Sequence, residues 1–205
     1  EVYADEYRYR VGHPVDAMFG LVADGLFMDN NDVANHGFQA FGTVQPGDIK
    51  YVDQNKDGII DGNDEVYVGR SQAPFSYGLN LKISYKSFTL FALGTGRAGA
   101  DSYINGNYYW VDGDEKYSEY ILNRWTENTK NTATYLRLTT LSSSNNFRNS
   151  TFWLYRNNYF TLNRVQLTYG LPATITNSLK MKQLDFYLNA SNLLTVSKYK
   201  DIRDL

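Results

Sequence analysis

The sequence lacks the residues on which several kinds of functional site depend. It has no cysteine, which excludes disulfide scaffolds, thiolate zinc sites and cysteine nucleophiles. Its two histidines, His13 and His36, lie far apart in the chain, which disfavours a histidine-rich catalytic metal site. The formal net charge is -2, so there is no excess of basic residues for binding nucleic acid.

Long apolar runs and familiar catalytic motifs are missing as well. No apolar stretch reaches the roughly 18 residues that a membrane-spanning helix needs, whereas barrel strands need only about 9–11 residues of alternating character. The G-x-S-x-G, H-E-x-x-H and P-loop patterns are absent, and the paired acids at 112–115 read as solvated loop residues. We therefore expect a protein that is not an enzyme.

Aromatic residues, in contrast, are abundant. They make up 16% of the chain, and 18 of them are tyrosines. A tyrosine combines an apolar ring with a polar hydroxyl, so it suits surfaces that are half buried. This composition fits a carbohydrate-binding surface, a β-sandwich or the aromatic girdles of a membrane barrel, and it does not choose among them.

Residues 77–85 show the clearest secondary-structure signal. Apolar side chains occupy every second position, with small or polar residues between them; the apolar positions are Tyr77, Leu79, Leu81, Ile83 and Tyr85. This period of two predicts a strand with one apolar and one polar face. Lys86-Ser87 predicts a two-residue connection to a second strand beginning at Phe88, whose register the less regular alternation leaves open.

Two further strands are predicted near the end of the chain. Residues 160–171 alternate with a slip of one position near Arg164, which indicates a β-bulge. Pro172 ends this strand because proline cannot donate a hydrogen bond to a sheet. A connection of about ten residues leads to another alternating segment, 184–193.

The connections between these strands are of two kinds. Those at 86–87 and 172–182 are short, whereas 12–76 and 94–158 are long polar regions, the second holding a possible short helix within 119–125. Outer-membrane barrels show this asymmetry, with short periplasmic turns and long extracellular loops. The fold class predicted is all-β: antiparallel strands that form part of a large outer-membrane β-barrel.

The segment 53–64 carries the sharpest local motif. Oxygen-bearing side chains fall at positions 1, 3, 5, 9 and 12 of a twelve-residue loop, with Gly58 at position 6 and Ile60 at position 8. This spacing matches the calcium loop of an EF-hand, apart from an aspartate in place of the final glutamate. The predicted calcium ligands are Asp53, Asn55, Asp57, the backbone carbonyl of Ile59, Asp61 and Asp64. The other interpretation is an Asx-rich turn that binds no metal.

Several motifs follow one another in order along most of the chain. They are GHP at 12–14, DGLF at 24–27, PGDIKY at 46–51 with the 53–64 loop and Gly69, FSYGLN at 75–80, WTEN at 125–128, STFWL at 150–154, YFTLNRV at 159–165, NASNLLT at 189–195 and KY at 198–199. This ordered set resembles the SusC/RagA family of TonB-linked outer-membrane transporters. No single motif is decisive, but their order is specific.

The resemblance implies a C-terminal barrel segment, spanning 1–205, of an importer in the bacterial outer membrane. It implies glycans or peptides as substrate, a SusD-like surface lipoprotein as lid, TonB as the energy-coupling partner and outer-membrane lipid around the strands. The plug and the TonB box of such a protein, and its final strands, are expected to lie outside these residues. The alternative that we retain is a soluble, calcium-stabilised, carbohydrate-binding β module.

Overall fold

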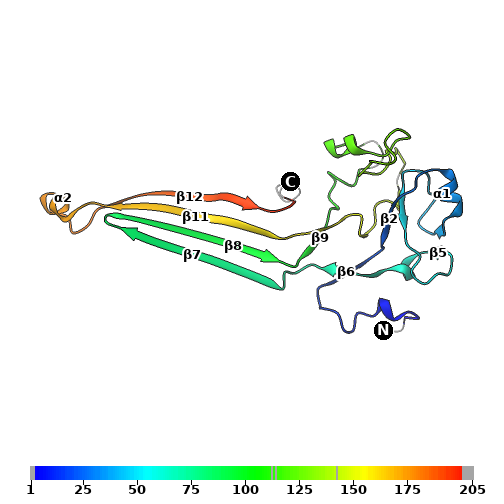
Figure 1. Cartoon of the computed structure of the whole chain (residues 1–205), viewed down its shortest axis with the longest axis horizontal. Coiled ribbons are helices and arrows are strands. Elements are labelled where there is room, and N and C mark those ends of the chain that lie inside the picture. The colour runs from blue at the N-terminus through cyan, green and yellow to red at the C-terminus, as the bar shows by residue number, and fades with distance from the viewer. Residues whose placement is uncertain (1–2, 112, 114, 142, 200–205) are drawn as a thin grey trace. The chain divides into compact units, whose positions relative to one another are not determined.

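The computed structural model describes residues 3–111, 113, 115–141 and 143–199. The chain forms two compact units (Figure 1). Unit 1 comprises Glu1–Ser71 and Asp101–Tyr155, and unit 2 comprises Gln72–Ala100 and Arg156–Leu205. The predicted long polar regions thus belong mainly to unit 1, and the predicted long strands to unit 2.

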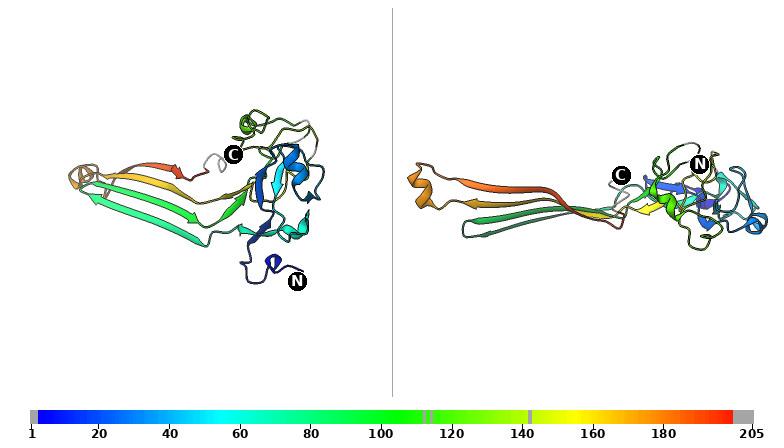
Figure 2. Two further views of the ribbon diagram at one scale, coloured as in Figure 1. Left: turned by 45° about the vertical axis from the view of Figure 1, so that its right-hand side comes forward. Right: turned by 90° about the horizontal axis from the view of Figure 1, so that it is seen from above.

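Unit 2 is built on one antiparallel sheet of four long strands. In the order of the sheet they are β12 (Asp185–Val196), β11 (Tyr159–Gly170), β8 (Phe88–Ala98) and β7 (Phe75–Tyr85). The views in Figures 1 and 2 agree that these strands lie side by side. Each strand has 11 or 12 residues, long for a globular protein and sufficient to cross a bilayer at a tilt.

The sheet confirms the alternation found in the sequence. The β7–β8 hairpin turns at Lys86 and Ser87, and Lys86 adopts a positive φ of 51°. The register shifts between Leu162 and Arg164, at the site of the predicted bulge. The connection after Pro172 differs from the expected loop, because it contains a short helix, α2 (Ala173–Ser178), with Pro172 as its N-cap residue.

Among its described residues, unit 1 contains only short regular elements. These are η1 (Glu6–Arg8), β1 (Ala17–Gly20), β2 (Ala23–Leu26), α1 (Asn30–Asn35), β3 (Phe38–Gln39), β4 (Ile49–Tyr51), β5 (Ile59–Ile60), η2 (Gly62–Asp64), β6 (Val66–Arg70), β9 (Asp101–Tyr103), η3 (Glu119–Asn123) and β10 (Leu154–Arg156), whose last residue belongs to unit 2. The strands pair as β1–β6, β2–β4, β3–β5 and β9–β10. The helix considered within 119–125 is the 3₁₀ helix η3.

The hydrophobic core lies in unit 1. Among the described residues, every buried apolar side chain except Ala100 belongs to this unit; the largest fully buried ones are Tyr51, Phe27, Leu21, Ile49, Ile60 and Leu136. The four long strands of unit 2 contribute none of these large side chains. The all-β prediction is confirmed. Unit 1 buries several of its large apolar side chains, whereas those of the long strands in unit 2 are wholly or partly exposed.

Candidate functional site

The sheet of unit 2 has one apolar and one polar face. Residues that lie directly opposite each other in an antiparallel pair share a face, so the register assigns each side chain. The apolar face carries Tyr77, Leu79, Leu81, Ile83, Tyr85, Phe88, Leu90, Ala92, Phe160, Leu162, Val165, Leu167, Tyr169, Phe186, Leu188, Ala190, Leu194 and Val196. Within unit 2 these side chains are largely uncovered: Leu79 is 59% exposed and Leu188 74%.

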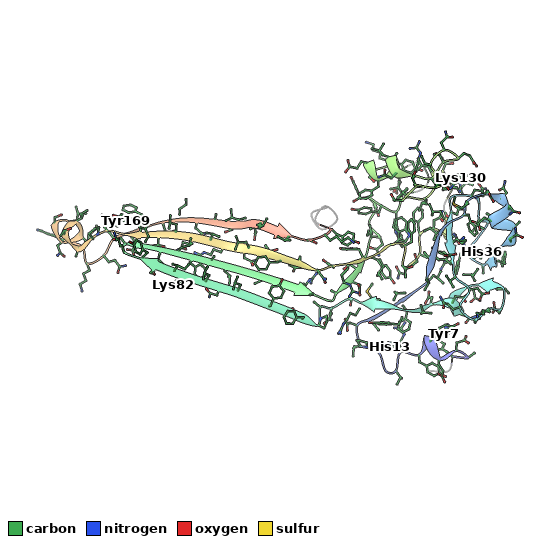
Figure 3. The ribbon with its side chains drawn as sticks, viewed as in Figure 1. Tyr7, His13, His36, Lys82, Lys130 and Tyr169 are labelled. Carbon is green, nitrogen blue, oxygen red and sulfur yellow. The ribbon has the colours of Figure 1, made fainter. Side chains whose placement is uncertain are left out.

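Aromatic rings lie at both ends of the apolar face. One end has Tyr77 and Phe160, whose ring centroids are 6.2 Å apart, and the other has Phe88 and Tyr169 at 4.8 Å. Tyr169 is labelled at the α2 end in Figure 3. Between the rings, the apolar face carries aliphatic side chains and glycines. This distribution matches the two aromatic girdles that flank the lipid-facing band of a barrel.

The height of the aliphatic band also suits a membrane. Tyr77 and Tyr85 are eight residues apart along β7. At about 3.3 Å per residue and a tilt of about 40°, that separation spans roughly 20 Å, close to the roughly 25 Å band of outer-membrane barrels.

Two glycines let the aromatic rings lie flat against the sheet. A Cβ atom on Gly94 would overlap the ring of Phe160, and one on Gly96 would overlap the ring of Tyr77. A Cβ atom on Gly78 would meet its nearest neighbour only at 3.9 Å. The sequence placed residues 94–96 in a long polar connection, but the Gly94-Thr95-Gly96 segment belongs to β8 and accommodates the rings of neighbouring strands.

The polar face holds a network of hydrogen bonds between side chains. Arg164 donates to Asn189 Oδ1 over 3.0 Å and to Gln166 Oε1 over 2.7 Å, and Gln166 donates to Thr168 over 3.1 Å. A shallow hollow on this face is lined by Lys82, Thr89, Phe91, Arg164, Gln166 and Thr168. Groups of this kind need water or polar partners, so this face is suited to an aqueous lumen.

The predicted calcium loop, 53–64, lies in unit 1 between β4 and β6 and includes β5 and η2. Asp53 accepts hydrogen bonds from the backbone N–H groups of Lys56 (2.6 Å) and Gly58 (2.8 Å). Gly58 has a positive φ of 86°, which explains why glycine suits position 6 of the loop. Ile60 is completely buried and pairs with Gln39 of β3, so the aliphatic residue at position 8 anchors the loop to the core.

The carboxylates of this loop are engaged by its own backbone. Asp57 accepts from Ile59 N (2.8 Å), and the buried Asp64 accepts from Gln54 N and Asp61 N, both at 2.8 Å. Within the described part of the chain, no group of three or more His, Cys, Asp or Glu side chains is placed to hold a metal ion. The loop backbone thus follows the motif, while convergence of the carboxylates on one point is not observed. Calcium binding stays a prediction.

A buried ion pair that the sequence did not reveal stabilises unit 1. Asp48 is 1% exposed, and Arg137 reaches it through Nε (2.7 Å to Oδ1) and a terminal nitrogen (3.3 Å to Oδ2). Asn146 donates to the same carboxylate over 2.9 Å, and the backbone N–H of Gln45 donates over 2.8 Å. Asp48 and Arg137 are 89 positions apart, so no local pattern could have paired them.

Side-chain amides complete this polar core. Gln39 donates to Ile49 O over 3.1 Å and accepts from Tyr51 N over 2.7 Å, so its amide pairs with the edge of β4 as a strand would. Asn145 donates to the same Ile49 carbonyl, and Asn146 accepts from Ile49 N over 2.9 Å. Both asparagines lie within 94–158, which the sequence predicted only as a long polar connection.

The tyrosines of unit 1 serve as structural hydrogen-bond donors. Burial raises the pKa of Tyr51 above its usual value and raises the pKa of Tyr135 to about 12. Tyr51 donates to Asn145 O over 2.8 Å, and Tyr135 donates to Tyr109 O over 2.6 Å. Both hydroxyls are therefore neutral near pH 7 and occupied by main-chain carbonyls, which suits a structural role.

Comparison with known proteins relates the sheet of unit 2 and the connections of unit 1 to a single kind of protein. No protein-family model matches the chain. A TonB-dependent receptor, P26 of Formosa agariphila, is 26% identical over 196 residues, which cover 94% of this chain and 19% of that protein. The solved RagAB peptide importer in its open-open state superimposes with a TM-score of 0.66 at 20% identity, covering 98% of this chain and 22% of that chain. A RagAB peptide transporter gives a TM-score of 0.67 at 21% identity, covering 91% and 19%.

The resemblance to the SusC/RagA family is confirmed. The structural likeness extends over nearly the whole chain, so the SusC/RagA-like fold includes both the long strands and the long connections. The chain spans about a fifth of the length of these relatives. As a separate finding, no helix among the described residues is long and apolar enough to cross a membrane.

Proposed function

We propose that this chain forms part of the wall of a TonB-dependent importer in the bacterial outer membrane. The observation that carries the proposal is the two-faced sheet of unit 2. Its apolar face is uncovered over four strands and ends in aromatic rings, while its opposite face is polar and hydrogen-bonded. In a soluble protein an apolar surface of this extent would need a cover, whereas in a barrel it contacts lipid.

The partners and the substrate belong to the same proposal. The likeness to a TonB-dependent receptor of Formosa agariphila supports coupling to TonB, and the likeness to RagAB supports a SusD-like lipoprotein as the partner. The imported substrate would be a peptide or an oligosaccharide; the description of RagAB as a peptide importer favours a peptide. The names of these relatives are those of a receptor and transporters, in keeping with a function that is not enzymatic.

The open edges of the sheet also support a barrel wall. Within the described residues, β7 and β12 each pair on one side only. An unpaired strand edge in lipid would leave backbone groups without hydrogen bonds, at several kcal/mol each. We therefore propose that both edges pair with further strands of a larger barrel, with the long connections of unit 1 on the extracellular side.

The alternative, a soluble carbohydrate-binding module, is less consistent with these features. The core of such a module would cover one face of the sheet, as the paired sheets of a β-sandwich do. Here most of the large apolar side chains on the apolar face are exposed, including Leu81 (44%) and Ile83 (51%) of β7. Calcium could still stabilise the 53–64 loop in either setting, because that loop lies in unit 1.

Cysteine labelling of the full-length protein in outer membranes tests the proposal. Single cysteines at Leu79, Leu81 and Ile83 should resist a water-soluble thiol reagent, because these positions face lipid. Cysteines at Asn80, Lys82 and Ser84 should react when the lumen is open to water. The chain has no cysteine of its own, so labelling of this segment has no background. Equal labelling of both sets, or the reverse pattern, would contradict the proposed orientation of the sheet.

A further inference from the structure

One end of the unit 2 sheet gathers two short connections. The β7–β8 turn at 86–87 and the segment 171–184, which contains α2, both lie there (Figure 1). The backbone N–H of Gly170 donates to Ser87 O over 2.8 Å, so the two connections are neighbours. We call this region, residues 86–87 and 171–184, the lysine cap.

The lysine cap is basic. It contains Lys86, Lys180 and Lys182 and has no aspartate or glutamate within its own residues. All three lysines are exposed, and the described ion pairs of the chain involve none of them. The next carboxylate along the chain, Asp185, belongs to the polar face of the sheet and accepts a hydrogen bond from Gln183 over 2.5 Å.

Exposed apolar side chains accompany the lysines. Ile175, Leu179 and Met181 are 45%, 52% and 47% exposed in the segment that follows β11. The adjoining end of the apolar face carries the aromatic residues Tyr85, Phe88, Tyr169 and Phe186. The Lys86 ammonium lies 5.3 Å from the centre of the Tyr85 ring, which places this charge at the margin of the apolar face.

This combination is suited to the boundary between lipid tails and headgroups. Aromatic rings favour that boundary, and lysine stems can lie along apolar surface while the ammonium extends to a headgroup phosphate. Basic residues close to an anionic membrane surface each strengthen binding. A partner with an apolar body and a phosphate at its end therefore complements both halves of the surface.

We propose that the lysine cap binds the phosphate headgroups of anionic phospholipids at the short-connection side of the membrane. The inference rests on the proposed function, because it requires the apolar face of the sheet to contact lipid. The lysines hold the headgroup, while Ile175, Leu179 and Met181 contact the upper part of the acyl chains. The cap thereby fixes the depth at which the strands sit in the bilayer.

Lipid retention by the full-length protein tests this inference. The purified protein, in neutral detergent, is mixed with phosphatidylglycerol or phosphatidylcholine, and the bound lipids are counted by native mass spectrometry. The wild type should retain phosphatidylglycerol in preference. Replacing Lys180 and Lys182 together by glutamine should weaken this retention by about tenfold or more. Retention of phosphatidylcholine should not change, and the double Lys→Arg variant should behave as the wild type.

A matched control separates a site from a general effect of charge. Lys116→Gln with Lys130→Gln removes the same charge from unit 1 and should leave phosphatidylglycerol retention unchanged. Equal loss in this control, or no preference for phosphatidylglycerol in the wild type, would overturn the lysine cap as a lipid site. If the wild type showed no preference for phosphatidylglycerol but the cysteines at 79–84 were labelled as expected, the lysine cap would be wrong and the proposed function would stand. If the labelling at 79–84 were equal on both faces or reversed, the proposed function itself would be contradicted.

Discussion

Units 1 and 2 differ in how they satisfy their backbone hydrogen bonds and in whether they bury their apolar side chains. Unit 1 has short strands and long connections, and it encloses a core with buried amides and an ion pair. Unit 2 has long regular strands and leaves its large apolar side chains uncovered. This difference shows that the pairing of strands in a sheet can supply the backbone hydrogen bonds without a hydrophobic core. The apolar face of such a sheet must then be covered by something outside the unit, such as lipid. Irregular connections need side chains such as Gln39 and Asn145 to complete their backbone hydrogen bonds.

The largest effect that we predict is in the polar core of unit 1. Arg137→Met leaves Asp48 buried without its counter-charge and should destabilise unit 1 by about 3–5 kcal/mol. Limited proteolysis of the full-length protein in urea would measure this, because cleavage should rise within unit 1 while the strands of unit 2 stay protected. Lys116→Met is the control: Lys116 is an exposed lysine of unit 1 that takes part in none of the described ion pairs, so the loss should stay below about 0.5 kcal/mol. Equal protection of both variants would mean that the ion pair does not stabilise unit 1.

The next effect probes the apolar face of unit 2. Leu81 lies near the middle of the aliphatic band, so Leu81→Arg should cost about 2–4 kcal/mol in a bilayer. Asn80→Arg, one position away on the polar face, should cost far less because its charge faces water. Urea unfolding in phospholipid vesicles compares the two variants. If Leu81→Arg destabilised the protein no more than Asn80→Arg, the apolar face would not contact lipid and the proposed assignment of the two faces would be wrong.

The smallest and most conditional effect concerns the 53–64 loop. If calcium binds there only in the folded state, a hundredfold excess over its dissociation constant stabilises the protein by about 2.7 kcal/mol. Asp57→Ala should then abolish a calcium-dependent rise in the melting temperature. Asp24→Ala, which removes an exposed carboxylate elsewhere in unit 1, should preserve that rise. No shift between chelator and millimolar calcium in the wild type, and no ion in anomalous scattering, would leave the hydrogen-bonded loop as a turn without metal.

The structural features that the sequence could predict are those determined by residues close together along the chain. The alternation in 77–85 revealed β7 and its two faces, and the slip near Arg164 revealed the bulge in β11. The hairpin turn at Lys86-Ser87 followed from the strands on either side. The glycine and aliphatic positions of the 53–64 loop were likewise local, and Gly58 and Ile60 occupy the expected roles in the backbone turn and the core.

The parts that sequence missed depend on contacts between distant segments. Gly94 and Gly96 look like strand breakers in isolation, but Phe160 and Tyr77 lie against them from neighbouring strands. Helix α2 follows Pro172 in a segment with no clear helical periodicity, and its one buried residue is Thr176. The edge pairing of β4 by Gln39 has no strand-like signature, because the pairing group is a side chain.

The sequence by itself determined that the chain forms alternating strands joined by short and long connections, because side-chain direction in a strand depends only on whether a position is odd or even. It also carried the ordered motifs that resemble those of the SusC/RagA family. Only the tertiary structure decided which acid meets which base: Asp48 and Arg137 share a buried contact across 89 positions. It also decided that the loop carboxylates bind their own backbone, and that the apolar residues of four strands share one uncovered face. Charge pairing and shared faces depend on distances in space, and no pattern of neighbours along the chain encodes those distances.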